Sequence, residues 1–124
     1  MKTAIIIISD PKANSDEANG RAFNALALAQ DCLKNGDEVE IAFIGAGTRW
    51  PAELTKAGHP FNALYNSVRE AVTGVSCGCA AAFGAGDGVQ ACGIKQVKDN
   101  AVDGTPGLLS VRRYLSAGWQ TLVF

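Results

Sequence analysis

The sequence predicts an α/β fold, a three-layer α/β/α sandwich built on a mostly parallel sheet of about five strands. Short apolar runs rich in β-branched residues and without polar alternation are typical of strands buried on both faces of a parallel sheet. Segments with apolar residues at helical spacing alternate with these runs. The chain has 124 residues and no repeat, linker or low-complexity segment, so we expect a single domain over residues 1–124.

The first part of the chain predicts a strand, a helix and a second strand. Residues 2–8 (KTAIIII) form an apolar run that predicts the first strand. Ser15 or Asn14 can cap a helix over residues 16–35, whose apolar residues recur at helical spacing. Residues 38–44 alternate and then become fully apolar, which predicts the second strand. The crossover between these parallel strands will be right-handed.

The rest of the chain predicts shorter elements. Residues 89–97 fit either a helix or an edge strand, and Thr105 with Pro106 is typical of a helix N-cap and first helical position. The glycine-rich segments at residues 45–47 and 84–88 are interpreted as turns. The other predicted elements are helices at residues 50–56, 61–71 and 108–117, a strand at 72–77, a short helix at 80–83 and a terminal strand at 119–124.

Charge and hydropathy argue against two classes of partner. The net charge is −1 and the basic residues are scattered, which gives no attraction to nucleic acid or to an anionic membrane. The apolar run at residues 4–8 is far shorter than the roughly 18 residues that span a bilayer, and it is not a convincing signal peptide. We therefore expect a cytoplasmic protein whose cysteines are reduced.

The cysteines of residues 75–92 are the main candidates for chemistry. Ligand-handling groups of parallel sheets collect at the carboxyl ends of the strands, where Cys77 is predicted to begin a helix. The unpaired N–H groups and the dipole at a helix start favour a thiolate. Cys79 is a secondary candidate, and Gly78 would let a bound group approach the backbone closely. The alternative is that these cysteines only pack as small apolar residues.

The remaining cysteines have weaker claims to a function. Cys92 lies beyond the glycine-rich loop, and Cys32 falls on the apolar side of the first predicted helix, so we expect it in the core. A disulfide between Cys77 and Cys79 would close a very small, strained ring, so it would be transient rather than structural.

The sequence gives no convincing metal or cofactor site. Cys77, Cys79, Cys92 and His59 lack the paired spacing of zinc ligands. The glycines of residues 45–47 lack the third glycine of a dinucleotide fingerprint, and those of residues 84–88 lack the Lys-Ser/Thr ending of a phosphate loop. We therefore expect neither a metal nor an organic cofactor.

Several polar side chains near the predicted strand ends have simpler explanations. A lone histidine before a proline, such as His59, is usually a surface residue or a local hydrogen-bond partner. Asp10 and Asn14 are expected to cap a helix. Arg49, Arg112 and Arg113 could offset an anionic sulfur species, although solvation at the surface explains them more simply.

The order of these segments resembles the DsrE-like family, which includes the sulfur-relay subunits DsrE, DsrF and TusD and the small YchN-type proteins. The resemblance covers nearly the whole chain. Its motifs are the end of the alanine-rich first helix with the following strand (KNGDEV and EIAFIG, residues 34–45), the cysteine turn (VSCGCAAAF, residues 75–83) and the closing segment (YLSAGWQTLVF, residues 114–124). Many relatives have Cys-Gly-x-Cys at this turn, whereas here Ala80 stands where the second cysteine would be.

The resemblance implies a sulfur carrier or sulfurtransferase without metal or organic cofactor. Cys77 would accept sulfane sulfur as a persulfide from a donor protein and pass it to an acceptor protein. The family commonly forms trimers, hexamers or mixed-subunit hexamers, so we expect a homo-oligomer or a mixed oligomer. Two alternatives stay open. One is a noncatalytic assembly or small-ligand-binding subunit, and the other is a thiol redox sensor with a reversible Cys77–Cys79 or Cys77–Cys92 disulfide.

Overall fold

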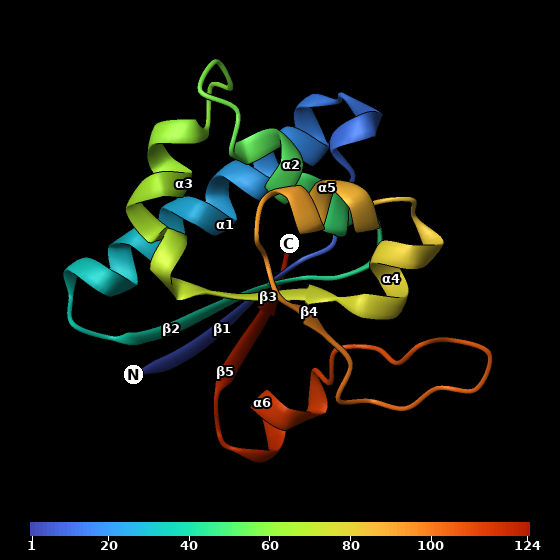
Figure 1. Cartoon of the computed structure of the whole chain (residues 1–124). Coiled ribbons are helices and arrows are strands. Elements are labelled where there is room, and N and C mark those ends of the chain that lie inside the picture. The colour runs from blue at the N-terminus through green and yellow to red at the C-terminus, as the bar shows by residue number, and fades with distance from the viewer.

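The computed structural model describes residues 1–124 and contains one five-stranded, all-parallel sheet (Figure 1). The strand order is β4-β3-β2-β1-β5. The strands are β1 (Lys2–Ile7), β2 (Glu38–Phe43), β3 (Val72–Ser76), β4 (Gln96–Val97) and β5 (Gln120–Val123). The α-helices are α1 (Asp16–Lys34), α2 (Trp50–Leu54), α3 (Asn62–Val68), α4 (Cys77–Ala82), α5 (Gly86–Ala91) and α6 (Arg112–Ser116). The predicted α/β/α sandwich is confirmed.

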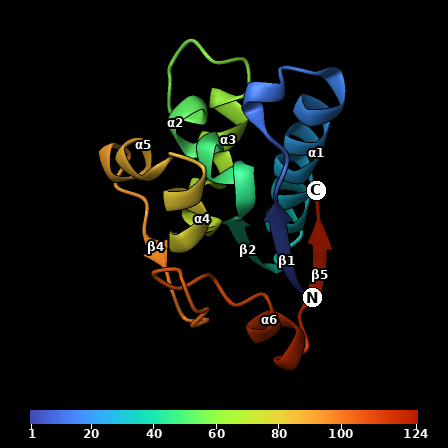
Figure 2. The same cartoon turned by 90° about the vertical axis from the view of Figure 1, so that its right-hand side faces the viewer.

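Helices cover the two faces of the sheet unequally. Figures 1 and 2 show α1, α2, α3 and α5 on one face, which we call the helical face. Only α6 and the irregular segment of residues 98–111 lie on the other, which we call the open face. None of the helices is long and apolar enough to cross a membrane.

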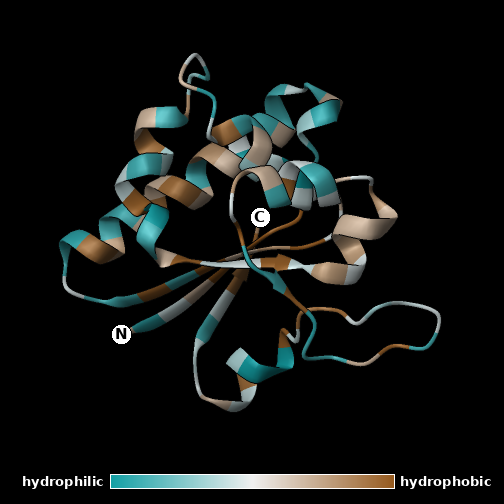
Figure 3. Cartoon of the chain, viewed as in Figure 1, coloured by the Kyte–Doolittle hydropathy of each residue, from teal (hydrophilic) through white to brown (hydrophobic).

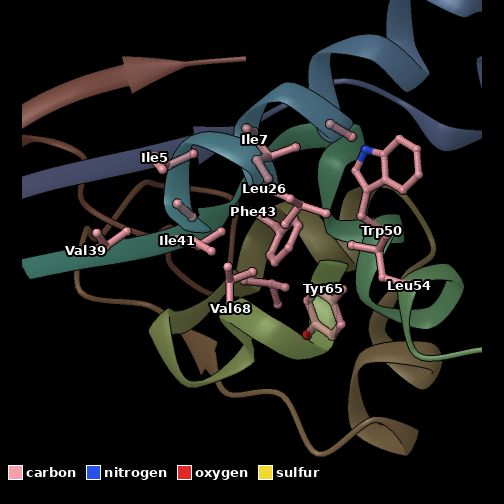
Figure 4. Close-up of a cluster of buried hydrophobic side chains, with 14 of the residues drawn as sticks. Ile5, Ile7, Leu26, Val39, Ile41, Phe43, Trp50, Leu54, Tyr65 and Val68 are labelled. Atoms are coloured by element: carbon pink, nitrogen blue, oxygen red, sulfur yellow. The ribbon is translucent and has the colours of Figure 1, made fainter. Parts of the chain in front are cut away.

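The helical face carries the larger core, with 18 buried residues. Figure 4 shows part of this cluster. The first helix is fixed to it by sequence-local features. The Ser15 hydroxyl accepts a hydrogen bond from the backbone N–H of Ala18, and Ala22, Leu26 and Ala29 then recur at helical spacing and are buried. The burial of this apolar stripe, at about 25 cal/mol per Å² of apolar area, stabilises α1 against the sheet.

The open face carries a smaller core of six buried residues. Successive side chains of a strand point to opposite faces, so Ile5 and Ile7 of β1 enter the larger core while Ala4 and Ile6 enter the smaller one. Both sets are fully buried, as predicted for a strand in the middle of a parallel sheet. Figure 3 shows the hydrophobic residues along the strands.

The prediction of a helix over residues 108–117 is wrong, because only Arg112–Ser116 is helical. Leu108 instead exchanges two backbone hydrogen bonds of 2.8 Å with Asn100, as in an antiparallel bridge. The Thr105 hydroxyl accepts from the N–H of Gly107 and donates to the carbonyl of Val102, so Thr105 stabilises a turn and does not cap a helix.

Two other boundaries differ from the sequence prediction. The glycine-rich segment at residues 84–88 is not wholly a turn, because α5 begins at Gly86. Residues 89–97 contain both expected alternatives, namely the end of α5 and the edge strand β4. The short helix predicted at residues 80–83 begins earlier, at Cys77.

Candidate functional site

The turn between β3 and α4 places two free cysteines at the carboxyl edge of the sheet. Cys77 is the first residue of α4, directly after β3, so it lies at the strand-to-helix turn that the sequence predicts. Cys77 and Cys79 are half-buried and form no disulfide. Cys32 is buried in the core of the helical face, which confirms its structural role.

The open-face segment of residues 98–111 is fastened to this turn. The backbone N–H of Gly78 donates to the carbonyl of Gly107 over 2.8 Å, and a Cβ atom at Gly78 would lie 2.5 Å from Cδ2 of Leu108. Gly78 thus permits a close approach, but the group that approaches is the chain itself. The Ser76 hydroxyl does not cap α4 and instead accepts from the backbone N–H of Leu109 over 3.0 Å.

Cys77 and Cys79 have different surroundings. Residues two apart on an α-helix do not share a face, so the two thiols point away from each other. Cys79 lines a cavity of about 420 Å³ on the open face, and Cys77 is not among its lining residues. We call this the Cys79 cavity. Its other lining residues are Ile44, Ser76, Asn100, Leu108, Leu109, Ser110, Val111 and Arg112.

A second cavity, of about 450 Å³, lies beside the segments that follow β1 and β2. No cysteine lines it. Of its polar side chains, Arg49 forms an ion pair of 3.0 Å with Asp10 and donates from Nε to the carbonyl of Phe83. Asp10 also accepts from the backbone N–H of Lys12, the capping role that the sequence predicts. Because no cysteine lines it, this cavity is separate from the cysteine turn.

The four residues considered for zinc do not come together. His59 accepts from the backbone N–H of Phe61 through Nδ1 over 3.0 Å and packs edge-on against Trp50, so it is the local hydrogen-bond partner expected from its sequence context. Cys92 lies at the end of α5, with Sγ 3.3 Å from the hydroxyl of Thr55. No group of three His, Cys, Asp or Glu side chains in the structure is arranged to hold a metal ion.

Two buried tyrosines, one on each face of the sheet, have raised pKa values. Burial is the main cause that raises the pKa of Tyr65 on the helical face, with Arg69 lowering it and Cys92 raising it. Burial also raises the pKa of Tyr114 on the open face, and Glu40 adds to the increase. Neither tyrosine lines the Cys79 cavity.

No protein-family model, curated protein or solved structure matches the chain. The resemblance to the DsrE-like family therefore stays a prediction from the sequence motifs.

The sequence does not predict which residues of the segment 98–111 line the Cys79 cavity. Asn100, Leu108 and Ser110 reach the cysteine turn only because residues 98–111 fold back over the open face. The bond from Leu109 to Ser76 joins residues 33 positions apart, and no local pattern in the sequence signals it. Arg112 is a sequence candidate only together with Arg49 and Arg113, as a side chain that could offset an anionic sulfur species.

Proposed function

We propose that the protein is a small cytoplasmic sulfur carrier or sulfurtransferase of the DsrE-like kind. Cys77 accepts sulfane sulfur as a persulfide and passes it to a partner protein, with Cys79 as a secondary thiol. The observation that supports this proposal is the position of both thiols, free and half-buried, where β3 ends and α4 begins. This edge of a parallel sheet is where ligand-handling groups usually collect.

The chemistry needs only thiols. The Cys77 thiolate attacks the sulfane sulfur of the donor, the donor S–S bond breaks, and the donor leaves as a thiolate. An acceptor thiolate then attacks the terminal sulfur of the Cys77 persulfide, and Cys77 leaves as the thiolate. Neither step consumes an oxidant or a reductant.

Helix geometry favours a carrier over a redox sensor that uses Cys77 and Cys79. Because these residues lie two apart on α4, a disulfide between them requires the first turn of the helix to unwind. A persulfide on a single thiol requires no such change.

Mass spectrometry after exposure of the native protein to inorganic polysulfide tests this proposal. We expect the peptide that contains Cys77 to gain the mass of one sulfur atom and the Cys77→Ser variant to lose this gain. Cys92→Ser is the matched control and should retain it, because Cys92 lies outside the turn. Native protein whose thiols all stay unmodified would refute the carrier.

A second proposal, that the chain assembles into a homo-oligomer or mixed oligomer, is favoured by the edge strand β5. This strand pairs only with β1, and it exposes Leu122 and Val123 to 43% and 62%. An apolar edge of this kind is a common site of association. Sedimentation should show an oligomer that Val123→Lys dissociates and that Leu115→Lys, an equally exposed position on α6, does not. A monomeric wild-type protein would overturn this proposal.

A further inference from the structure

The lining of the Cys79 cavity combines an apolar wall with polar side chains, of which only Arg112 is charged. Ile44, Leu108, Leu109 and Val111 form an apolar wall. The polar lining consists of Ser76, Cys79, Asn100, Ser110 and Arg112, and no carboxylate belongs to it. Arg112 is the only charged side chain of this lining, which favours an anionic ligand.

Arg112 is the one arginine of the chain without a carboxylate or aromatic partner, so its guanidinium is free for a ligand. A guanidinium binds a carboxylate through two parallel hydrogen bonds, a geometry that a lysine cannot provide. The other arginines are engaged: Arg21 pairs with Glu17, Arg49 with Asp10, and Arg113 with Glu40 and Asp99, while Arg69 lies over the ring of Tyr65.

Ser76 adds a buried hydroxyl to the lining of the cavity. Its residue is only 1% exposed and lines the cavity. Its oxygen accepts a hydrogen bond from the backbone N–H of Leu109 over 3.0 Å. A serine hydroxyl that accepts one hydrogen bond can also donate one, so a ligand with an acceptor atom can bond to Ser76.

We propose that the Cys79 cavity binds a small mercaptocarboxylate persulfide, which delivers its sulfur to Cys79. This inference rests on the proposed sulfur-carrier function and adds the class of a small-molecule donor. Arg112 binds the carboxylate, the Ser76 hydroxyl donates to an acceptor atom of the ligand, and the apolar wall contacts its methylene groups. An amino-acid persulfide fits less well, because no carboxylate in the cavity can pair with its ammonium group.

The transfer is balanced without a further reactant. The Cys79 thiolate attacks the terminal sulfur of the ligand and forms a new S–S bond. The S–S bond of the ligand breaks, and the mercaptocarboxylate leaves as a thiolate with the electron pair and takes a proton from water. Cys79 then accepts sulfur from small donors that carry a carboxylate, whereas Cys77, outside the cavity, exchanges sulfur with protein partners and inorganic polysulfide.

Site-resolved mass spectrometry with two matched donors tests the inference. The donors are the persulfide of 3-mercaptopropionate and that of its methyl ester, which lacks the negative charge. We expect the acid to modify Cys79 roughly tenfold faster than the ester, as a charge-assisted hydrogen bond implies. Arg112→Gln should abolish this preference. Arg21→Gln, which removes an exposed arginine of α1, should keep it.

The outcomes separate this inference from the carrier function. If polysulfide modifies Cys77 while both organic donors modify Cys79 at equal rates, the cavity proposal is overturned and the carrier stands. If no donor modifies any thiol, the carrier and the sulfur transfer both fail.

Binding of the unreactive analogue 3-(methylthio)propionate then decides whether the cavity is a carboxylate site. Shifts of the amide NMR signals of Ser76, Leu109 and Arg112 that vanish in Arg112→Gln would support it, and their absence would overturn it.

Discussion

The two faces of the sheet are covered in different ways. On the helical face, α1, α2, α3 and α5 bury a cluster of 18 residues, whereas on the open face the five-residue helix α6 and residues 98–111 bury only six (Figure 2). The core of the helical face is thus three times larger than that of the open face. The Cys79 cavity lies on the loosely covered side.

The strand order explains this difference. β4 and β5 are the two edge strands, so the connection between them must pass over the whole sheet. Within this connection the chain turns back on itself at the antiparallel bridge between Asn100 and Leu108. It is held by the bond from Leu109 to Ser76 and by a 2.7 Å bond from the N–H of Ser110 to Asp99. The larger core therefore lies on the helical face, and the Cys79 cavity lies on the open face.

A matched pair of core truncations is expected to change the free energy of unfolding most. Leu26→Ala on the helical face should lower the free energy of unfolding by about 4 kcal/mol, because Leu26 is fully buried among tightly packed residues. Leu109→Ala on the open face should cost about 2 kcal/mol, because Leu109 already borders a cavity and loses fewer contacts. Urea unfolding measures both values. Equal losses would show that the open face is packed as well as the other.

A pair of glycine substitutions tests how tightly the open-face segment is held. Gly78→Ala should destabilise the protein by roughly 1–3 kcal/mol, because the new Cβ would collide with Leu108. Gly86→Ala, with no atom within 4 Å of the new Cβ, should be neutral or stabilise α5 by roughly 0.5–1 kcal/mol. A tolerated alanine at Gly78 would mean that residues 105–108 can move away from the turn.

A pair of tyrosine substitutions, with a smaller expected effect, tests whether the buried hydroxyl on each face has a hydrogen-bond partner. The hydroxyl of Tyr65 is buried without a partner, so Tyr65→Phe should leave stability unchanged or raise it by up to about 1 kcal/mol. The hydroxyl of Tyr114 is bonded to Arg113 and Thr73, so Tyr114→Phe should cost about 1 kcal/mol. Thermal unfolding of the two variants measures these changes. A larger loss of stability in Tyr65→Phe than in Tyr114→Phe would show that the hydroxyl of Tyr65 has a hydrogen-bond partner.

The smallest effect is a dependence of stability on alkaline pH. The pKa values of Tyr65 and Tyr114 are raised in the folded protein, so the folded state holds these protons more firmly than the unfolded chain. Their contribution is fully present below the unfolded tyrosine pKa of about 10 and is lost as the pH rises through the folded values. Denaturant titrations above pH 10 should show a shallower decline in Tyr65→Phe. An unchanged slope would contradict the assigned burial effect.

Local patterns were enough to predict most of the fold. The apolar runs, the Ser15 cap and the helical spacing of α1 each depend on residues within a few positions of one another, and so does the position of Cys77 between β3 and α4. The extended form of Leu108 and Leu109 depends on partners far along the chain, which overrides their preference for a helix. The Cys79 cavity could not be predicted for the same reason.

The central claim is that the cysteine turn carries sulfur, and a pulse and chase of labelled sulfane sulfur tests it most directly. Native protein is exposed briefly to labelled polysulfide, and the excess is removed. A thiol acceptor is then added while site-resolved mass spectrometry follows Cys77. The account predicts that Cys77 gains one sulfur atom and that the acceptor removes it. A Cys77 thiol that takes up sulfur only after the protein is unfolded would contradict the account.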